Sequence, residues 1–103
     1  NVTQPLPGLS ELVGILVQVT DVNVRLVGRL ASLRDLTNDI DEIDRLEGEA
    51  DAAYRRTMAD LFGGTHDALD ILRWKDVVEA VERSINAVET ASDVIESISV
   101  KHA

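Results

Sequence analysis

The sequence predicts an all-α fold, a three-helix up-down-up bundle, on the strength of three observations. Apolar residues recur every three or four positions over three long stretches of the 103-residue chain. The breaks between these stretches are short, which makes consecutive helices antiparallel neighbours. Aliphatic residues supply most of the 45% apolar content, and only 3% of residues are aromatic. This composition favours packed helices over a β-sandwich.

The chain is expected to hold one domain. Residues 1–7 contain both prolines and are predicted to form an extended lead-in or linker, and residues 8–103 form the bundle. Because the chain begins at Asn1 and its only Met is internal, we expect it to be part of something longer.

A first helix is predicted from residue 8 to residue 36. The valines between Val17 and Leu26 alternate with other residues, which is also typical of a β-strand. The alternation fails on both sides of that window while the helical period persists, so the helix is favoured. Asn23 lies within the apolar arc of this helix and is expected to be a hydrogen-bonded core or interface residue.

The apolar arc of the first helix spans roughly 220° of the helical wheel, about twice what two partner helices can cover. One of two rows must therefore face water. These rows are Val13, Val17, Val24 and Val27, or Leu12, Leu16, Leu26 and Leu30. A contiguous exposed apolar patch marks an interaction surface, so we expect a homodimer through this helix.

A second helix is predicted from residue 39 to residue 62, with Thr37 or Asn38 as its cap and Gly63-Gly64 as its stop. A third runs from residue 72 to residue 100 after a connector. The core stripe of the second helix is predicted to be Ile43, Leu46, Ala50, Tyr54, Thr57, Leu61 and Phe62. That of the third is predicted to be Trp74, Val77, Val78, Val81, Ile85, Val88, Ser92, Ile95 and Ser99.

Two pairs of oxygen ligands are the candidate chemistry. Glu47 falls about 40° from the centre of the second helix's apolar stripe, and Asp51 follows one turn later at about 80°. Glu82 and Asn86 repeat the i, i+4 spacing beside the core stripe of the third helix. Oxygen ligands on two neighbouring helices can bind Mg²⁺, Ca²⁺, Mn²⁺ or iron. The alternative is that Glu47 is a boundary residue whose stem packs and whose carboxylate reaches water.

Composition excludes several classes of function. The absence of cysteine excludes disulfides, thiolate zinc sites and cysteine catalysis. A net charge of −9 argues against direct nucleic-acid binding and fits a cation or a basic partner. No apolar run is long enough for membrane insertion and no signal peptide is visible, which fits a cytoplasmic location.

Enzymatic function is also disfavoured. No Asp or Glu is followed three residues later by a His, as the di-iron helical enzymes require. His66 is expected to be a solvated loop residue, and His102 lies at the terminus. A metal-dependent hydrolase is a distant third hypothesis, because three helices with short links offer little of a cleft.

Several segments resemble the PhoU-like family, in particular the branch that accompanies Pit-type phosphate permeases. Glu47-Gly-Glu-Ala-Asp51 looks like that family's E-x-x-x-D signature, and Glu82-Arg-Ser-Ile-Asn86 looks like a second copy of it. Two further segments resemble the same branch: the stretch that begins at Ile71, Ile-Leu-Arg-Trp-Lys-Asp, and the end of the chain, Ile-Ser-Val-Lys-His-Ala. The resemblance covers the chain from about Pro5 to Ala103.

The resemblance implies a PhoU-like three-helix bundle, equivalent to the second of two tandem bundles. Members bind metal ions, often iron or zinc clusters, through the E-x-x-x-D carboxylates. They are cytoplasmic, commonly oligomeric, and act as regulators or accessories of phosphate transport rather than as enzymes. A phosphate permease or a phosphate-sensing protein would then be the partner. Carried over by position, Glu47, Asp51 and Glu82 match, whereas Asn86 stands where the pattern more often has Asp, which weakens a hard-cation site. The alternative is a helical protein–protein interaction module without a metal site.

Overall fold

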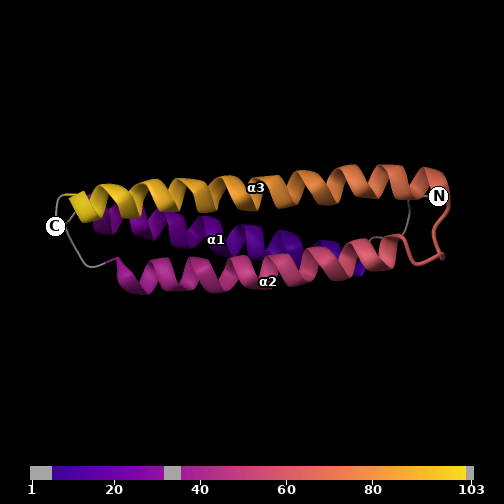
Figure 1. Cartoon of the computed structure of the whole chain (residues 1–103), viewed down its shortest axis with the longest axis horizontal. Coiled ribbons are helices and arrows are strands. Elements are labelled where there is room, and N and C mark those ends of the chain that lie inside the picture. The colour runs from indigo at the N-terminus through magenta and orange to yellow at the C-terminus, as the bar shows by residue number, and fades with distance from the viewer. Residues whose placement is uncertain (1–5, 32–35, 102–103) are drawn as a thin grey trace.

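A computed structural model describes residues 6–31 and 36–101, and its regular structure is entirely α-helical. The helices are α1 (Pro7–Ala31), α2 (Thr37–Leu61) and α3 (Ala68–Lys101). They pack side by side into a rod of 53 × 17 × 16 Å, in which α2 runs opposite to α1 and α3 (Figure 1). The predicted all-α bundle is confirmed, and the strand alternative for the valine-rich segment is wrong.

The helix ends follow from local chemistry. Pro7 opens α1, where a missing backbone N–H costs nothing. The preceding Leu6 is buried in the core although it lies in the predicted lead-in. The prediction that α1 extends beyond Ala31 falls partly on residues 32–35, outside the described residues. The α2 helix ends at Leu61, just before Gly64 adopts a positive φ of 97°, as the Gly63-Gly64 pair predicted.

Two helix starts differ from the sequence prediction. The cap position of α2 is Leu36, which makes no side-chain capping bond, and Thr37 already lies within the helix. The α3 helix begins at Ala68, four residues earlier than predicted, because Asp67 caps it. The backbone N–H of Asp70 donates a hydrogen bond to Asp67 Oδ1 at 2.9 Å. This bond is the main cause that lowers the pKa of Asp67.

The core runs the length of the rod and draws on all three helices. Its buried apolar members are Leu6, Leu12, Ile15, Val19, Val22, Leu26, Leu36, Ile43, Leu46, Ala50, Ala53, Leu61, Val78 and Ile85. Thr57 and Ser92 are also buried, whereas Tyr54, Trp74, Val81, Val88, Ile95 and Ser99 are half-buried. Phe62 and Val77 were predicted as core residues, but both are exposed, so these two assignments are wrong.

Polar contacts fix the register of the helices. Asp39 at the start of α2 is buried and pairs with Arg29 of α1, Nε to Oδ2 at 2.8 Å. Further along, the Arg56 guanidinium contacts Glu11 at 2.7 Å. Between α1 and α3, Asn23 Nδ2 donates to Ser92 Oγ at 3.0 Å, so Asn23 is hydrogen-bonded as predicted. None of the described helices contains a stretch long and apolar enough to cross a membrane.

Candidate functional site

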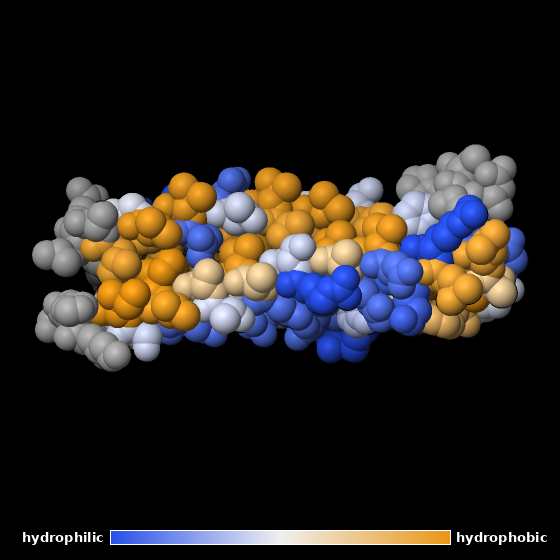
Figure 2. Space-filling view, turned by 90° about the horizontal axis from the view of Figure 1, so that it is seen from above, coloured by the Kyte–Doolittle hydropathy of each residue, from blue (hydrophilic) through white to orange (hydrophobic). Residues whose placement is uncertain are grey.

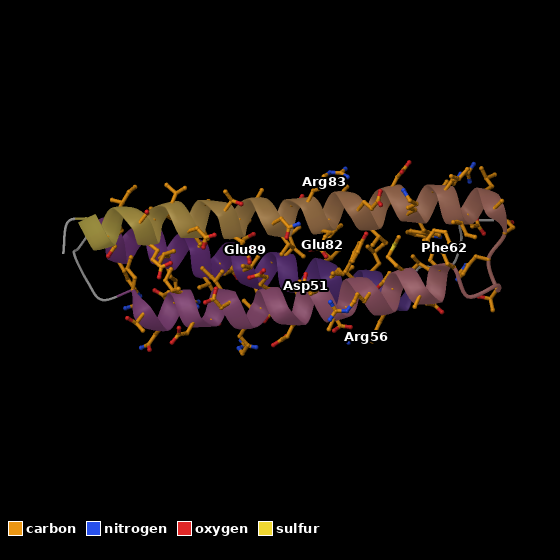
Figure 3. All side chains as sticks on the ribbon, in the orientation of Figure 1. Asp51, Arg56, Phe62, Glu82, Arg83 and Glu89 are labelled. Atoms are coloured by element: carbon orange, nitrogen blue, oxygen red, sulfur yellow. The ribbon has the colours of Figure 1, made fainter. Side chains whose placement is uncertain are left out.

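Carboxylates from α2 and α3 meet along the seam between these two helices. The charges of Asp51 and Glu47 on α2 both act on Glu82 of α3, so three of the four predicted site residues face one another. Figure 3 shows Asp51, Glu82 and Glu89 in the space between the two ribbons. We call Glu47, Asp51, Glu82 and Glu89 the acidic seam.

Asn86, the fourth predicted residue, is exposed on the flank of α3, as Asp51 is on the flank of α2. Its side chain is exposed, and its backbone carbonyl accepts a bond from Thr90 Oγ1 at 2.9 Å. Glu89, which was not predicted as a site residue, lies next to Glu47. The i, i+4 rule led to Asn86, but α3 packs in a seven-residue repeat, and Glu89 lies one full repeat after Glu82. Glu89 is part of the same polar stripe in the sequence, so its heptad spacing was the available signal.

Glu89 is the most perturbed ionisable group of the seam. Burial raises its pKa, and a side-chain hydrogen bond with Glu47 and the charges of Glu47, Asp93 and Asp51 raise it further, to about 8. Two carboxyl groups can share a hydrogen bond only if one carries a proton. The raised pKa of Glu89 means that the pair of carboxyl groups keeps one proton at neutral pH.

Glu82 is perturbed in the same direction. Burial is the first cause of its raised pKa, followed by the charges of Asp51 and Glu47. The Oε2 atoms of Glu82 and Glu89 are both shielded from solvent, and neither accepts a hydrogen bond from the described part of the chain. The seam therefore gathers negative charge and leaves acceptor oxygens without donors.

Basic side chains close to the seam are engaged or directed elsewhere. Lys75 Nζ contacts Glu79 on its own helix at 3.1 Å. Arg45 of α2 pairs with Glu49 on the outer surface of that helix. Arg83 projects away from α2 in Figure 3. Within residues 6–31 and 36–101, no ion pair neutralises the carboxylates of the acidic seam.

The described side chains do not form a preassembled metal site. No group of three or more His, Asp or Glu residues in residues 6–31 and 36–101 has the spacing to hold a metal ion. His66 lies near Asp60, Nε2 to Oδ2 at 3.8 Å, at one end of the rod, and His102 falls outside the described residues. A surface recess of about 300 Å³ adjoins the seam and is lined by Tyr54, Glu79, Glu82 and Arg83. The seam as it stands can hold a proton and attract a cation.

Comparison with known proteins adds no relative: no family model, curated protein or solved structure matches this chain.

Proposed function

We propose that this protein is a non-enzymatic, metal-binding regulator or accessory of inorganic phosphate transport, built as a PhoU-like up-down-up bundle. The observation that supports the metal-binding part is the acidic seam, where the charges of four carboxylates from two helices act on one another and no basic side chain of the described residues forms an ion pair with them. The phosphate-transport part rests on the resemblance of the two E-x-x-x-D-like segments to those of PhoU-like proteins.

A divalent cation would relieve the strain of the seam in two ways. It would supply the positive charge that Glu47, Asp51 and Glu82 lack, and it would displace the proton from Glu89. Carboxylate oxygens suit Mg²⁺, Mn²⁺ and iron, and they also bind zinc. The shielded Oε2 atoms of Glu82 and Glu89 are the acceptors such an ion would use. Because the carboxylates are spread along the seam, ion binding would also have to draw their side chains together.

Thermal unfolding with added Mn²⁺, Fe²⁺, Zn²⁺ or Mg²⁺ tests this proposal. A cation that binds the folded chain raises Tm. At a free cation concentration of 100 times its Kd, the free energy of unfolding rises by about 2.7 kcal/mol. The double variant E47Q/E82Q should lose the rise while keeping its helical content, because the loss of like-charge repulsion offsets the loss of ligands. The control is D44N/E49Q, which removes two exposed carboxylates of α2 and should keep the rise.

Two results would count against metal binding. One is an unmodified chain whose Tm does not change with any of the four ions. The other is an equal rise in both double variants, which would assign the effect to general screening. Elemental analysis of the purified protein would then identify the ion that is retained, iron and zinc being the expected metals.

The proposed location and partner follow from the same function. A regulator of this kind acts in the cytoplasm on a phosphate permease or on a phosphate-sensing protein. Co-purification with a permease from cells that express both, tested with and without phosphate, would examine this step.

The second candidate function is a helical interaction module without a metal site, and a separate observation favours it. The valine row of α1 is the one that faces water: Val17 is 55% and Val24 is 66% exposed, whereas Leu12 and Leu26 are fully buried. We propose that the chain forms a homodimer through α1. Sedimentation that shows a monomer at tens of micromolar would contradict this.

A further inference from the structure

One side of the rod carries an uncharged surface built from two helices. We call it the α1–α3 face. On α1 it comprises Val13, Val17, Thr20, Val24 and Val27; on α3 it comprises Val77, Ala80, Ser84, Ala87, Ala91, Val94 and Ile98. All twelve residues are exposed, and on each helix they follow alternating steps of three and four. Contact positions of packed helices have this spacing, but here the residues stay exposed within their own chain.

The two rows lie side by side on the surface that faces away from α2. The Asn23–Ser92 bond shows that α1 and α3 are adjacent, and it sets their register. Each residue of α1 lies level with the residue of α3 that is 69 positions later in the chain. In this register Val17 lies level with Ala87, and Val24 lies level with Val94, each within one residue. Figure 2 shows apolar side chains gathered along this side of the molecule, over α3 and α1.

We propose that the α1–α3 face binds the same face of a second copy, related by a two-fold axis that runs parallel to the helices. This inference extends the proposed self-association through α1 by assigning α3 an equal share of the interface. In this arrangement the valine row of each α1 packs on the small-residue row of the partner's α3. Both contacts form twice, as an isologous interface requires.

The difference in side-chain size between the two rows favours this orientation. The middle of the α3 row consists of Ala80, Ser84, Ala87 and Ala91, whereas every position but one in the α1 row is valine. A two-fold axis perpendicular to the helices would stack α1 on α1 and α3 on α3. Packed helices lie 8 to 10 Å apart, and the distance depends on the side chains between them. The two α3 helices, with small residues in contact, would then need a shorter distance than the two α1 helices, with valines in contact. Valine on small residues gives both helix pairs the same spacing.

The distribution of charge favours a second copy as the occupant. The chain carries a net charge of −9, and its acids are concentrated on α2 and on the side of α3 that faces α2. Contact through the α1–α3 face places the two α2 helices on opposite outer sides of the dimer, where their charges repel least. The face runs about 32 Å along α3, from residue 77 to residue 98 at 1.5 Å per residue. With the 17 Å width of the rod this gives roughly 500 Å² per copy, which is the size of a weak, reversible interface.

Sedimentation of the full chain at tens of micromolar tests the interface. The unmodified chain, 11.3 kDa, should sediment as a dimer of twice that mass. The variants V17K/V24K on α1 and A87K/A91K on α3 should each give monomers with unchanged helical content. The control is A59K/F62K, which introduces the same charge at two exposed positions, one in the last turn of α2 and one just beyond its end, where Phe62 is 55% exposed like Val17. It should stay dimeric.

Crosslinking tests the orientation, and the chain has no native cysteine to interfere. A mixture of V17C chains and A87C chains should form a disulfide between unlike chains on mild oxidation. T20C alone should not crosslink, because the axis keeps the two α1 helices apart. Efficient T20C crosslinking with no V17C–A87C product would overturn the proposed orientation.

The outcomes separate this inference from the proposal on which it rests. A dimer that V17K/V24K disrupts but A87K/A91K does not would keep self-association through α1 and refute the role of α3. An unmodified chain that is monomeric would refute both, and would assign the face to another occupant, such as a preceding segment of a longer protein or a different partner. Neither result depends on the metal proposal.

Discussion

At the scale of single residues, the charge of the acidic seam depends on the protonation of Glu89. Glu47 and Glu89 come from different helices, and burial together with the neighbouring carboxylates raises the pKa of Glu89 to about 8, so the pair keeps a proton at neutral pH. Like-charge neighbours on both helices make that proton hard to remove. A single carboxyl group therefore couples the packing of α2 on α3 to pH.

The pKa of Glu89 predicts a loss of stability as pH rises. In the unfolded chain Glu89 titrates near 4.5, whereas its pKa in the folded chain is about 8, so the folded state binds the extra proton between these values. Stability from this group is fully present below about pH 4.5 and is lost as pH rises through about 8. The E89Q variant should match the unmodified chain near pH 5 and have a higher Tm at pH 8 to 9.

The control for this prediction is E96Q, which removes an exposed carboxylate from the same helix and should keep the fall in Tm at alkaline pH. Thermal unfolding from pH 5 to pH 9 without divalent cations is the measurement. Parallel Tm curves for E89Q and the unmodified chain would show that Glu89 does not hold the proton.

Gly8 shows how closely α1 and α2 approach at one end of the rod. A Cβ atom added at Gly8 would overlap Thr57 Oγ1, which itself donates to the Ala53 carbonyl at 2.7 Å. The G8A variant should lose about 1 to 3 kcal/mol of unfolding free energy, because overpacking outweighs the better helix propensity of alanine. Chemical denaturation measures the change.

Gly48 provides the matched control, because a Cβ added there meets no atom within 4 Å. The same glycine-to-alanine change inside a helix should then stabilise the chain by about 0.5 to 1 kcal/mol. If G8A stabilises the chain as much as G48A does, the close approach of α1 and α2 at Gly8 is wrong.

At the scale of the helices, the sequence predicted the elements well and their edges less well. Apolar periodicity located all three helices, and the Gly63-Gly64 pair located the end of α2. The start of α3 was missed because Asp67 was assigned to a connector, although aspartate is a common cap. Phe62 was assigned to the core from its position on an ideal wheel, but it lies beyond the last helical residue, where that wheel no longer applies.

The site was predictable to the same degree. Glu47, Asp51 and Glu82 were predicted from their spacing and their nearness to the apolar stripes, and their charges do act on one another, whereas Glu89 was not predicted. A wheel gives the angle of a residue around its own helix. It does not give the axial level at which two helices meet, and that level brings Glu89 to Glu47. The register depends on long-range contacts such as Asn23–Ser92, which periodicity does not reveal.

The turn between α2 and α3 depends on the backbone of Gly64. Its φ of 97° lies in a region that side chains with a Cβ disfavour. The G64A variant should lose about 1 to 2 kcal/mol. G64N should lose less, because asparagine tolerates positive φ better than alanine does. The unfolding free energies of the two variants are the measurement. A Cβ added at Gly64 meets no atom within 4 Å, so an equal loss in both variants would contradict the role given to the positive φ.

At the scale of the whole molecule, the rod has two opposed sides. The side that holds α2 and the acidic seam is strongly negative, and the α1–α3 face is uncharged along its length. The proposed metal site and the proposed self-association surface therefore use different residues. The excess of acids also means that the folded rod repels itself electrostatically.

This repulsion predicts an unusual response to salt. Ion pairs such as Arg56–Glu11 are exposed, so screening them costs little, whereas the repulsion among the acids of α2 and α3 acts over distances that salt screens effectively. Raising NaCl from 20 to 300 mM should therefore increase Tm. A smaller increase in Tm is expected for E47Q/E82Q, because two of the repelling charges are gone. A fall in Tm with NaCl would mean that the ion pairs between α1 and α2 outweigh the repulsion.

Divalent salts at matched ionic strength separate screening from binding. If the acidic seam binds a cation, MnCl₂ or MgCl₂ should raise the Tm of the unmodified chain above its value in NaCl, because occupation of a site adds to screening. The E47Q/E82Q variant should have the same Tm in divalent and monovalent salt, because only screening is left. Protein concentration is held constant, because dimerisation through the α1–α3 face would itself raise Tm with concentration. If the unmodified chain has the same Tm in divalent and monovalent salt, screening explains the whole effect. That result would favour the interaction module over the metal-binding regulator.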